Sequence, residues 1–112
     1  MPIQNEAVRA HPFLQEMYQD GYFPKHLVDE VKRVLVELCE QIESTRPADD
    51  AALLVLTHAA TERVNDLQEA FWEAESEIET AARDCIGMDF DFVARAYGFD
   101  VDVEELISPR DW

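Results

Sequence analysis

A histidine and a glutamate four residues apart, His58 and Glu62, form the pair in this sequence that comes nearest to a metal site. On a helix, residues with this spacing are neighbours. Thr61 and Asn65 would extend the same flank, so the four side chains could line a pocket for a small ligand or a metal ion. Metal sites in helical bundles, however, repeat a Glu-x-x-His pair on facing helices, and that pattern is absent here. A structural role for these polar groups is therefore favoured, and no metal or cofactor is predicted.

A run of carboxylates around a tryptophan is the second candidate. Its members lie between positions 69 and 79 and are Glu69, Trp72, Glu73, Glu75, Glu77 and Glu79. Carboxylates that surround an aromatic anchor could engage the basic surface of a protein partner. The alternative is a solvated face, which is what charge runs usually form.

A cysteine nucleophile is the third candidate, because Cys39 or Cys85 could meet His58 across a helical bundle. A reactive thiol needs an electropositive and partly exposed site. Both cysteines instead fall at apolar helical positions of an acidic chain, which predicts buried, unreactive thiols. Phosphate-binding, metalloprotease, hydrolase and calcium-loop motifs are also absent, so the sequence favours a protein without enzymatic activity.

The charge balance narrows the class of partner. The chain has 112 residues and a net charge of −16, from 25 acidic and 9 basic residues. Such a field repels nucleic acids and anionic membranes, and it would speed the capture of a basic protein. General solubility is the alternative reason for acidity, and it is the more common one. Because no apolar run resembles a membrane span or a signal core, the sequence predicts a cytoplasmic location.

Helices must position these side chains, and the sequence predicts helices throughout. Between Leu53 and Trp72, apolar residues recur every three or four positions, and the polar flank widens the uncharged arc beyond half of the circumference. A surface helix needs an apolar stripe of only about 100°. This helix is therefore predicted to lie in the middle of an all-α, single-domain bundle of about four main helices.

The predicted boundaries begin with a flexible N-terminal arm at residues 1–10, followed by a single helical domain at residues 11–112. Helices are expected over residues 12–19 and 24–45, the second with a seam of apolar residues spaced by three and four. Asp49 or Asp50 is expected to cap the third helix, because a short carboxylate accepts hydrogen bonds from free helical N–H groups. A short C-terminal helical turn is expected near residues 103–107, capped by Asp102.

The fourth helix is the least regular of the predicted elements. Ser76 and Glu79 form a capping-box pattern at its start. A straight helix would place Asp89 on the apolar face, where an unpaired carboxylate is costly. We therefore predict a kink or break near Gly87, with Asp89 capping the segment that follows.

Three long segments together resemble a known family. They are HPFLQEMYQDGYFP, LVDEVKRVLVELCEQIE, and THAATERVNDLQEAFWEAESEIETAARDCI with the tail AYGFD…EELI…RDW. They are similar to a bacterial family of small acidic proteins catalogued as domain of unknown function fifty-seven thirteen. The resemblance spans about residues 11–112 and implies a compact helical protein. It implies no activity, cofactor or catalytic residue.

Three functional hypotheses follow from these observations. The first is a non-enzymatic module that binds a basic protein through its acidic surface, for example as an immunity-type inhibitor. The alternative is a bundle that binds a small ligand or a metal through the polar flank around His58. Self-association through the wide apolar arc is a third, weaker hypothesis, so that the protein would be a monomer or a homodimer.

Overall fold

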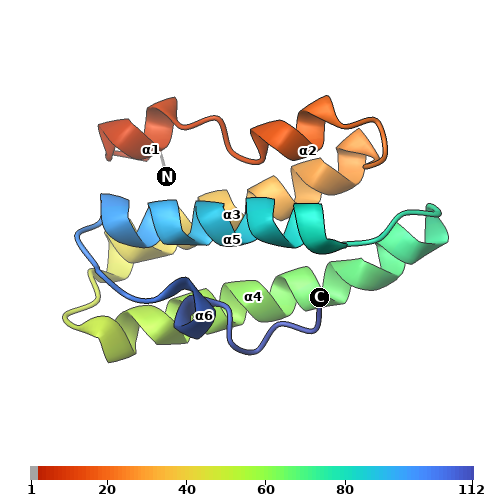
Figure 1. Ribbon diagram of the computed structural model, residues 1–112. Helices are drawn as coiled ribbons and strands as arrows, with labels where there is room; N and C mark the ends of the chain where they lie inside the picture. Colours follow the sequence, from red (N-terminus) through yellow and green to blue (C-terminus); the bar gives the residue numbers. More distant parts are fainter. Residues whose placement is uncertain (1–2) are drawn as a thin grey trace.

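Helices make up all of the regular secondary structure in the computed structural model, which describes residues 3–112 (Figure 1). In chain order they are α1 Glu6–Ala10, α2 Gln15–Gln19, α3 Lys25–Thr45, α4 Asp50–Glu73, α5 Thr80–Ala96 and α6 Val103–Leu106. No strand occurs within residues 3–112. The prediction of an all-α bundle is confirmed.

The two longest helices, α3 and α4, form an antiparallel pair joined by a short loop (Figure 1). Their facing seams supply a large part of the core, and the buried side chains include Val31, Leu35, Leu38, Leu53, Val64 and Phe71. The Asp49 side chain accepts a hydrogen bond of 2.9 Å from the Ala52 N–H and so caps α4, as predicted. A capping interaction of this kind is worth about 1 kcal/mol.

The remaining helices cover this pair from two sides. The helices α1 and α2 lie along one side of α3 and α5, whereas α6 and the C-terminal tail lie against α4 (Figure 1). Packing on two sides explains why α4 has such a wide uncharged arc. The same packing covers much of the arc that self-association was expected to use.

The helix α5 runs without interruption through Gly87, so the predicted break is wrong. Asp89 is buried, as a straight helix requires, but it does not cap a new segment. Its carboxylate contacts His11 Nε2 at 2.8 Å and accepts a hydrogen bond of 2.7 Å from the Leu14 N–H. These two contacts offset the desolvation of the carboxylate, which is the cost on which the prediction of a break was based.

The segment predicted as an N-terminal arm contains a short helix that the sequence did not predict. This helix, α1, is capped by the Asn5 side chain and buries Val8 against the core. The Glu43 carboxylate of α3 accepts hydrogen bonds from the N–H groups of Gln4 and Asn5, at 2.8 and 3.0 Å. The segment is therefore held by specific contacts, while residues 1 and 2 of the predicted arm lie outside the described range.

The predicted start of α2 is also corrected, since the helix begins at Gln15 and not at residue 12. The cause is Leu14, which is fully buried in a left-handed conformation with φ of 57°. This conformation breaks the helical path and turns the Leu14 N–H toward Asp89.

The C-terminal end follows the predicted pattern. Gly98 ends α5 with φ of 87°, a left-handed conformation that glycine adopts without steric cost. Asp102 caps α6 by accepting a hydrogen bond of 2.9 Å from the Glu104 N–H. Trp112 is only 6% exposed, so the terminal residue is docked. Among the described residues, no helix has the length and apolar character needed to cross a membrane.

Candidate functional site

The polar flank of α4 contacts a segment of the chain itself. His58 Nε2 lies 2.7 Å from the Glu105 carbonyl oxygen, and because a carbonyl only accepts, this nitrogen carries the proton. The Thr61 hydroxyl donates to the Thr57 carbonyl at 2.8 Å and lies 3.4 Å from the Leu106 carbonyl oxygen. These groups therefore fix the C-terminal end of α6 to α4.

Asn65 completes this attachment through both ends of its amide. Its Nδ2 donates to the Pro109 carbonyl at 3.0 Å, and its Oδ1 accepts from the Asp111 N–H at 2.8 Å. We call the contacts of His58, Thr61 and Asn65 with residues 105–111 the tail clasp. The fourth residue predicted for this site, Glu62, is exposed and takes no part in the clasp.

The flank is thus occupied by backbone groups that would otherwise lack partners. Within residues 3–112, no group of three or more histidine, cysteine, aspartate or glutamate side chains is placed to hold a metal ion. The clasp uses the hydrogen-bonding groups that a small ligand would need.

The two cysteines are buried in the positions that the sequence predicted. Burial, together with the nearby Glu43 carboxylate, raises the pKa of Cys39 to about 12. Burial also raises the pKa of Cys85. Both thiols therefore stay protonated at neutral pH, which is the reverse of what a nucleophile requires.

The carboxylate run occupies the end of α4 and the turn into α5. We call Glu69, Trp72, Glu73, Glu75, Glu77 and Glu79 the acidic end. Trp72 is 57% exposed, and the carboxylates are exposed except for Glu79, which is half-buried. Within the described part of the chain, none of these carboxylates forms an ion pair. Among the described residues, therefore, no lysine or arginine in direct contact neutralises the negative charge of the acidic end.

The turn at the acidic end has a strained backbone. Glu75 adopts φ of 60°, while the Ser76 N–H donates to the Phe71 carbonyl at 2.8 Å and the Glu75 N–H donates to the Trp72 carbonyl at 3.0 Å. This hydrogen-bond pattern is a Schellman motif, in which the left-handed position is usually glycine. A side chain there costs roughly 1 kcal/mol.

Ser76 has a different role from the predicted one. It is buried, and its hydroxyl donates to the Tyr22 carbonyl at 3.2 Å. The helix α5 begins later, at Thr80, and has no side-chain cap, so the predicted capping box is wrong. The physical reason is that the Ser76 N–H is bonded within the Schellman turn and its hydroxyl is bonded to Tyr22, so the hydroxyl does not cap α5.

Tyr22 is a feature of this region that the sequence did not assign to the site. It is 47% exposed, and the Ser76 contact places it beside the acidic end. Figure 1 shows the α2–α3 loop and the α4–α5 loop at the same end of the molecule. Two exposed aromatic residues, Tyr22 and Trp72, are thus at one end of the molecule together with the unpaired carboxylates.

Comparison with known proteins identifies the family. A family of unknown function, DUF5713, matches residues 7–112. The chain belongs to DUF5713. This confirms the resemblance seen in the sequence. No curated protein matches this DUF5713 chain, and no solved structure matches it either.

The structure divides the predicted site residues of this DUF5713 protein into two groups. His58, Thr61 and Asn65 are brought together on the tail, whereas the acidic end stays exposed to solvent. The sequence did not reveal the tail as the partner of the flank. The hydrogen-bonded residues are more than 40 positions apart, as in the case of Asn65 and Pro109 with a separation of 44.

Proposed function

We propose that this protein is a non-enzymatic binding module that holds a basic protein partner through its acidic end, in the manner of an immunity-type inhibitor. The observation that carries the proposal is Trp72, a large aromatic side chain that is 57% exposed among carboxylates without ion pairs. Aromatic residues at the centre of an interface commonly supply most of its binding energy. The surrounding charges would attract and orient the partner.

The strained turn supports the same proposal. Glycine at position 75 would relieve the left-handed strain, yet the chain has a glutamate there that contributes a further exposed carboxylate. Backbone strain of this kind is concentrated at functional sites. A role in recognition gives a physical reason for the glutamate, because the turn directs charge toward the solvent where a partner would dock.

The partner should carry lysine or arginine residues around an apolar depression that accepts an indole ring. A tryptophan side chain can bury about 150–250 Å² on association. The carboxylates remain at the rim of the contact, where they speed association and are screened by salt. Binding should therefore be strong at low ionic strength and should weaken steeply as the salt concentration rises.

The test is co-purification of the tagged protein from its native host at about 50 mM and about 500 mM salt, where the Debye length falls severalfold. Mass spectrometry identifies what is retained, and the identified protein is then produced separately to measure its Kd. The proposal predicts one basic protein that is retained at low salt and lost at high salt. The absence of any protein at low salt, or an acidic partner whose binding ignores salt, would contradict it.

A further inference from the structure

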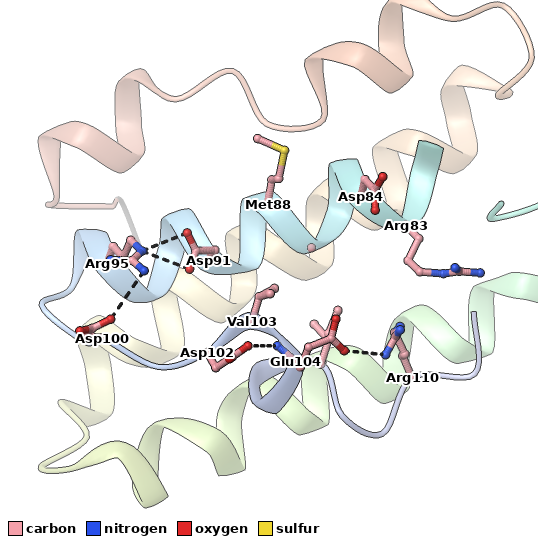
Figure 2. Close-up of a pocket in the computed structure, with 12 residues that line it drawn as sticks. Arg83, Asp84, Met88, Asp91, Arg95, Asp100, Asp102, Val103, Glu104 and Arg110 are labelled. Atoms are coloured by element: carbon pink, nitrogen blue, oxygen red, sulfur yellow. Dashed lines mark hydrogen bonds and ion pairs between the residues drawn. The ribbon is translucent and has the colours of Figure 1, made fainter. Parts of the chain in front are cut away.

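A groove of about 740 Å³ lies between α5 on one side and α6 with the tail on the other (Figure 2). Its size falls within the range of about 300–1,000 Å³ that is typical of small-molecule sites. Its apolar surface comes from Gly87, Met88, Val103 and Ile107. Met88 is 68% exposed, and Figure 2 shows its side chain pointing away from α6, so it borders the groove only at its edge.

Arginines are concentrated in this groove. Of the nine lysine and arginine residues in the chain, Arg83, Arg95 and Arg110 line it. Arg95 is already neutralised, because its guanidinium contacts Asp91 at 3.0 Å and Asp100 at 3.6 Å. This end of the groove is therefore electrostatically satisfied.

The other end of the groove has unused donors. Figure 2 shows the Arg83 side chain, from α5, and the Arg110 side chain, from the tail, at the end of the groove opposite Arg95. Arg83 forms no ion pair within residues 3–112, whereas Arg110 contacts Glu104 at 3.5 Å and lies over the Trp112 ring, 6.0 Å from its centre. The Nε atoms of both arginines are buried without a hydrogen-bond partner. A buried donor without a partner is unfavourable, so both arginines have hydrogen-bonding capacity that contacts within the described chain leave unused.

We infer that this groove is a binding site for a small organic monocarboxylate. The carboxylate would accept hydrogen bonds from Arg83 and Arg110, and the apolar body of the ligand would lie over Gly87 toward Val103 and Ile107. Arginine binds carboxylates through paired N–H groups, which is the chemistry that these donors offer. The site is separate from the acidic end and does not depend on the function proposed for it.

The charges of the groove favour a single negative charge over several. The lining also contains five carboxylates, Asp84, Asp91, Asp100, Asp102 and Glu104, and the chain as a whole has a charge of −16. A polyanion such as a nucleotide would be repelled by this field several times more strongly than a monoanion, whose single charge the two arginines can offset. Screening within about 8 Å at physiological salt further reduces the repulsion from distant carboxylates.

The spacing of residues along α5 sets the expected length of the apolar part of the ligand. Arg83 and Gly87 are four residues apart on one helix, which is a rise of about 6 Å at 1.5 Å per residue. A Cβ atom on Gly87 would lie 3.6 Å from both Val103 and Ile107, so at this residue α5 approaches the side chains of the α6 segment closely. A chain of six carbons spans this distance, which makes hexanoate a suitable probe.

The experiment is an NMR titration of the intact protein with hexanoate, with acetate and hexylammonium as probes that lack the tail or the negative charge. The inference predicts saturable shifts at the amides of Gly87 and Val103 with hexanoate, and at least tenfold weaker binding of both other probes. Arg83→Gln and, independently, Arg110→Gln should each weaken hexanoate binding at least fivefold. The matched control Arg33→Gln removes an exposed charge on α3 and should have no effect.

Three results would overturn the inference. One is the absence of saturable shifts at the groove amides, and another is hexylammonium binding as tightly as hexanoate. The third is hexanoate binding that is unchanged in both arginine variants. Thermal unfolding of each variant shows whether it is folded, and two separate arginine variants keep the test valid if one of them is unstable.

Discussion

The acidic end and the α5–α6 groove lie on either side of the start of α5. They differ in how their charged side chains are paired. At the acidic end, the carboxylates flank the exposed Trp72 in the sequence, form no ion pair within residues 3–112 and are exposed, except for the half-buried Glu79. In the groove, arginines and carboxylates line the same surface, and ion pairs join Arg95 to Asp91 and Asp100, and Arg110 to Glu104. At the acidic end, the groups without a partner are negatively charged carboxylates, which accept hydrogen bonds. In the groove, they are buried arginine N–H groups, which donate them.

The comparison teaches that the net charge of −16 does not by itself identify the partner. Pairing and burial decide which charges are available, because a paired charge contributes little to recognition of a third group. The first region fits a basic protein, and binding there should weaken with salt. The second fits a monoanion, and binding there should weaken little, since salt also screens the repulsion from distant carboxylates.

The largest effect is expected from Trp72→Ala. Because truncation of a central aromatic anchor commonly costs 2 kcal/mol or more, affinity for the basic partner should fall by about 30-fold or more. The free energy of unfolding should change little, since the side chain is 57% exposed. Calorimetric titration with the isolated partner measures the first quantity and urea denaturation the second. A matched variant, Tyr22→Ala, shows whether the neighbouring aromatic contributes as well.

Asn65→Ala should weaken ligand binding in the groove without weakening partner binding at the acidic end. The substitution removes both hydrogen bonds of the Asn65 amide to the tail, so the free energy of unfolding should fall by about 1–3 kcal/mol. A loosened tail displaces Arg110, and hexanoate binding should weaken with it. Partner binding at the acidic end should remain within about twofold, which is about 0.4 kcal/mol. Equal losses at both regions would show that they are not independent.

Glu75→Gly should make the protein more stable while it reduces partner binding. Glycine relieves the left-handed strain at φ of 60°, and the free energy of unfolding should rise by about 1 kcal/mol. Glu75→Gln is the matched control, because it removes the charge and keeps the strain. If Glu75→Gly failed to stabilise the protein in urea denaturation, the strain argued for this turn would be absent.

Gly87→Ala should stabilise α5 and narrow the groove. Alanine in a helix interior is favoured over glycine by up to about 1 kcal/mol, and the added methyl group would meet Val103 and Ile107 at an ordinary contact distance of 3.6 Å. Hexanoate binding should weaken severalfold, and partner binding should not change. Gly98→Ala is the contrasting variant, because its φ of 87° makes any side chain strained and destabilising.

The smallest effect concerns pH. Although burial opposes ionisation of Glu43, hydrogen bonds from Tyr97, Gln4 and Asn5 outweigh it and lower the pKa of this carboxyl below 4.5. A lowered folded-state pKa contributes stability above about pH 4.5, and this contribution is lost as the pH falls through the folded value. Glu43→Gln should therefore flatten the acid limb of a stability curve below about pH 4.5. The exposed Glu77→Gln should leave that limb unchanged.

Local patterns in the sequence predicted much of the fold. The seam of α3 and the caps at Asp49 and Asp102 involve residues within a few positions of one another, and the structure confirms them. The continuous α5 could not be predicted in this way. The groups that satisfy Asp89 are His11 and the Leu14 N–H, which lie 78 and 75 positions away in the sequence.

The acidic end and the groove also differ in how far the sequence could predict them. The acidic end is contiguous in the sequence, so its residues could be identified from the printed chain alone. The groove depends on Arg83 and Arg110, which only the path of the tail brings together. That path is set by the tail clasp, whose polar residues the sequence indicated without revealing their partner.

The central claim is that the position of the carboxylates, and not their total number, recruits the partner. The most direct test compares two triple variants with equal net charge. The first combines Glu73→Gln, Glu75→Gln and Glu77→Gln at the acidic end. The second combines Glu6→Gln, Glu16→Gln and Glu62→Gln elsewhere on the surface. All six glutamates are exposed. The measurement is the slope of log Kd for the isolated partner against log salt concentration. The first variant should lose most of the slope and the second should keep it. Equal slopes in the two variants would contradict the claim.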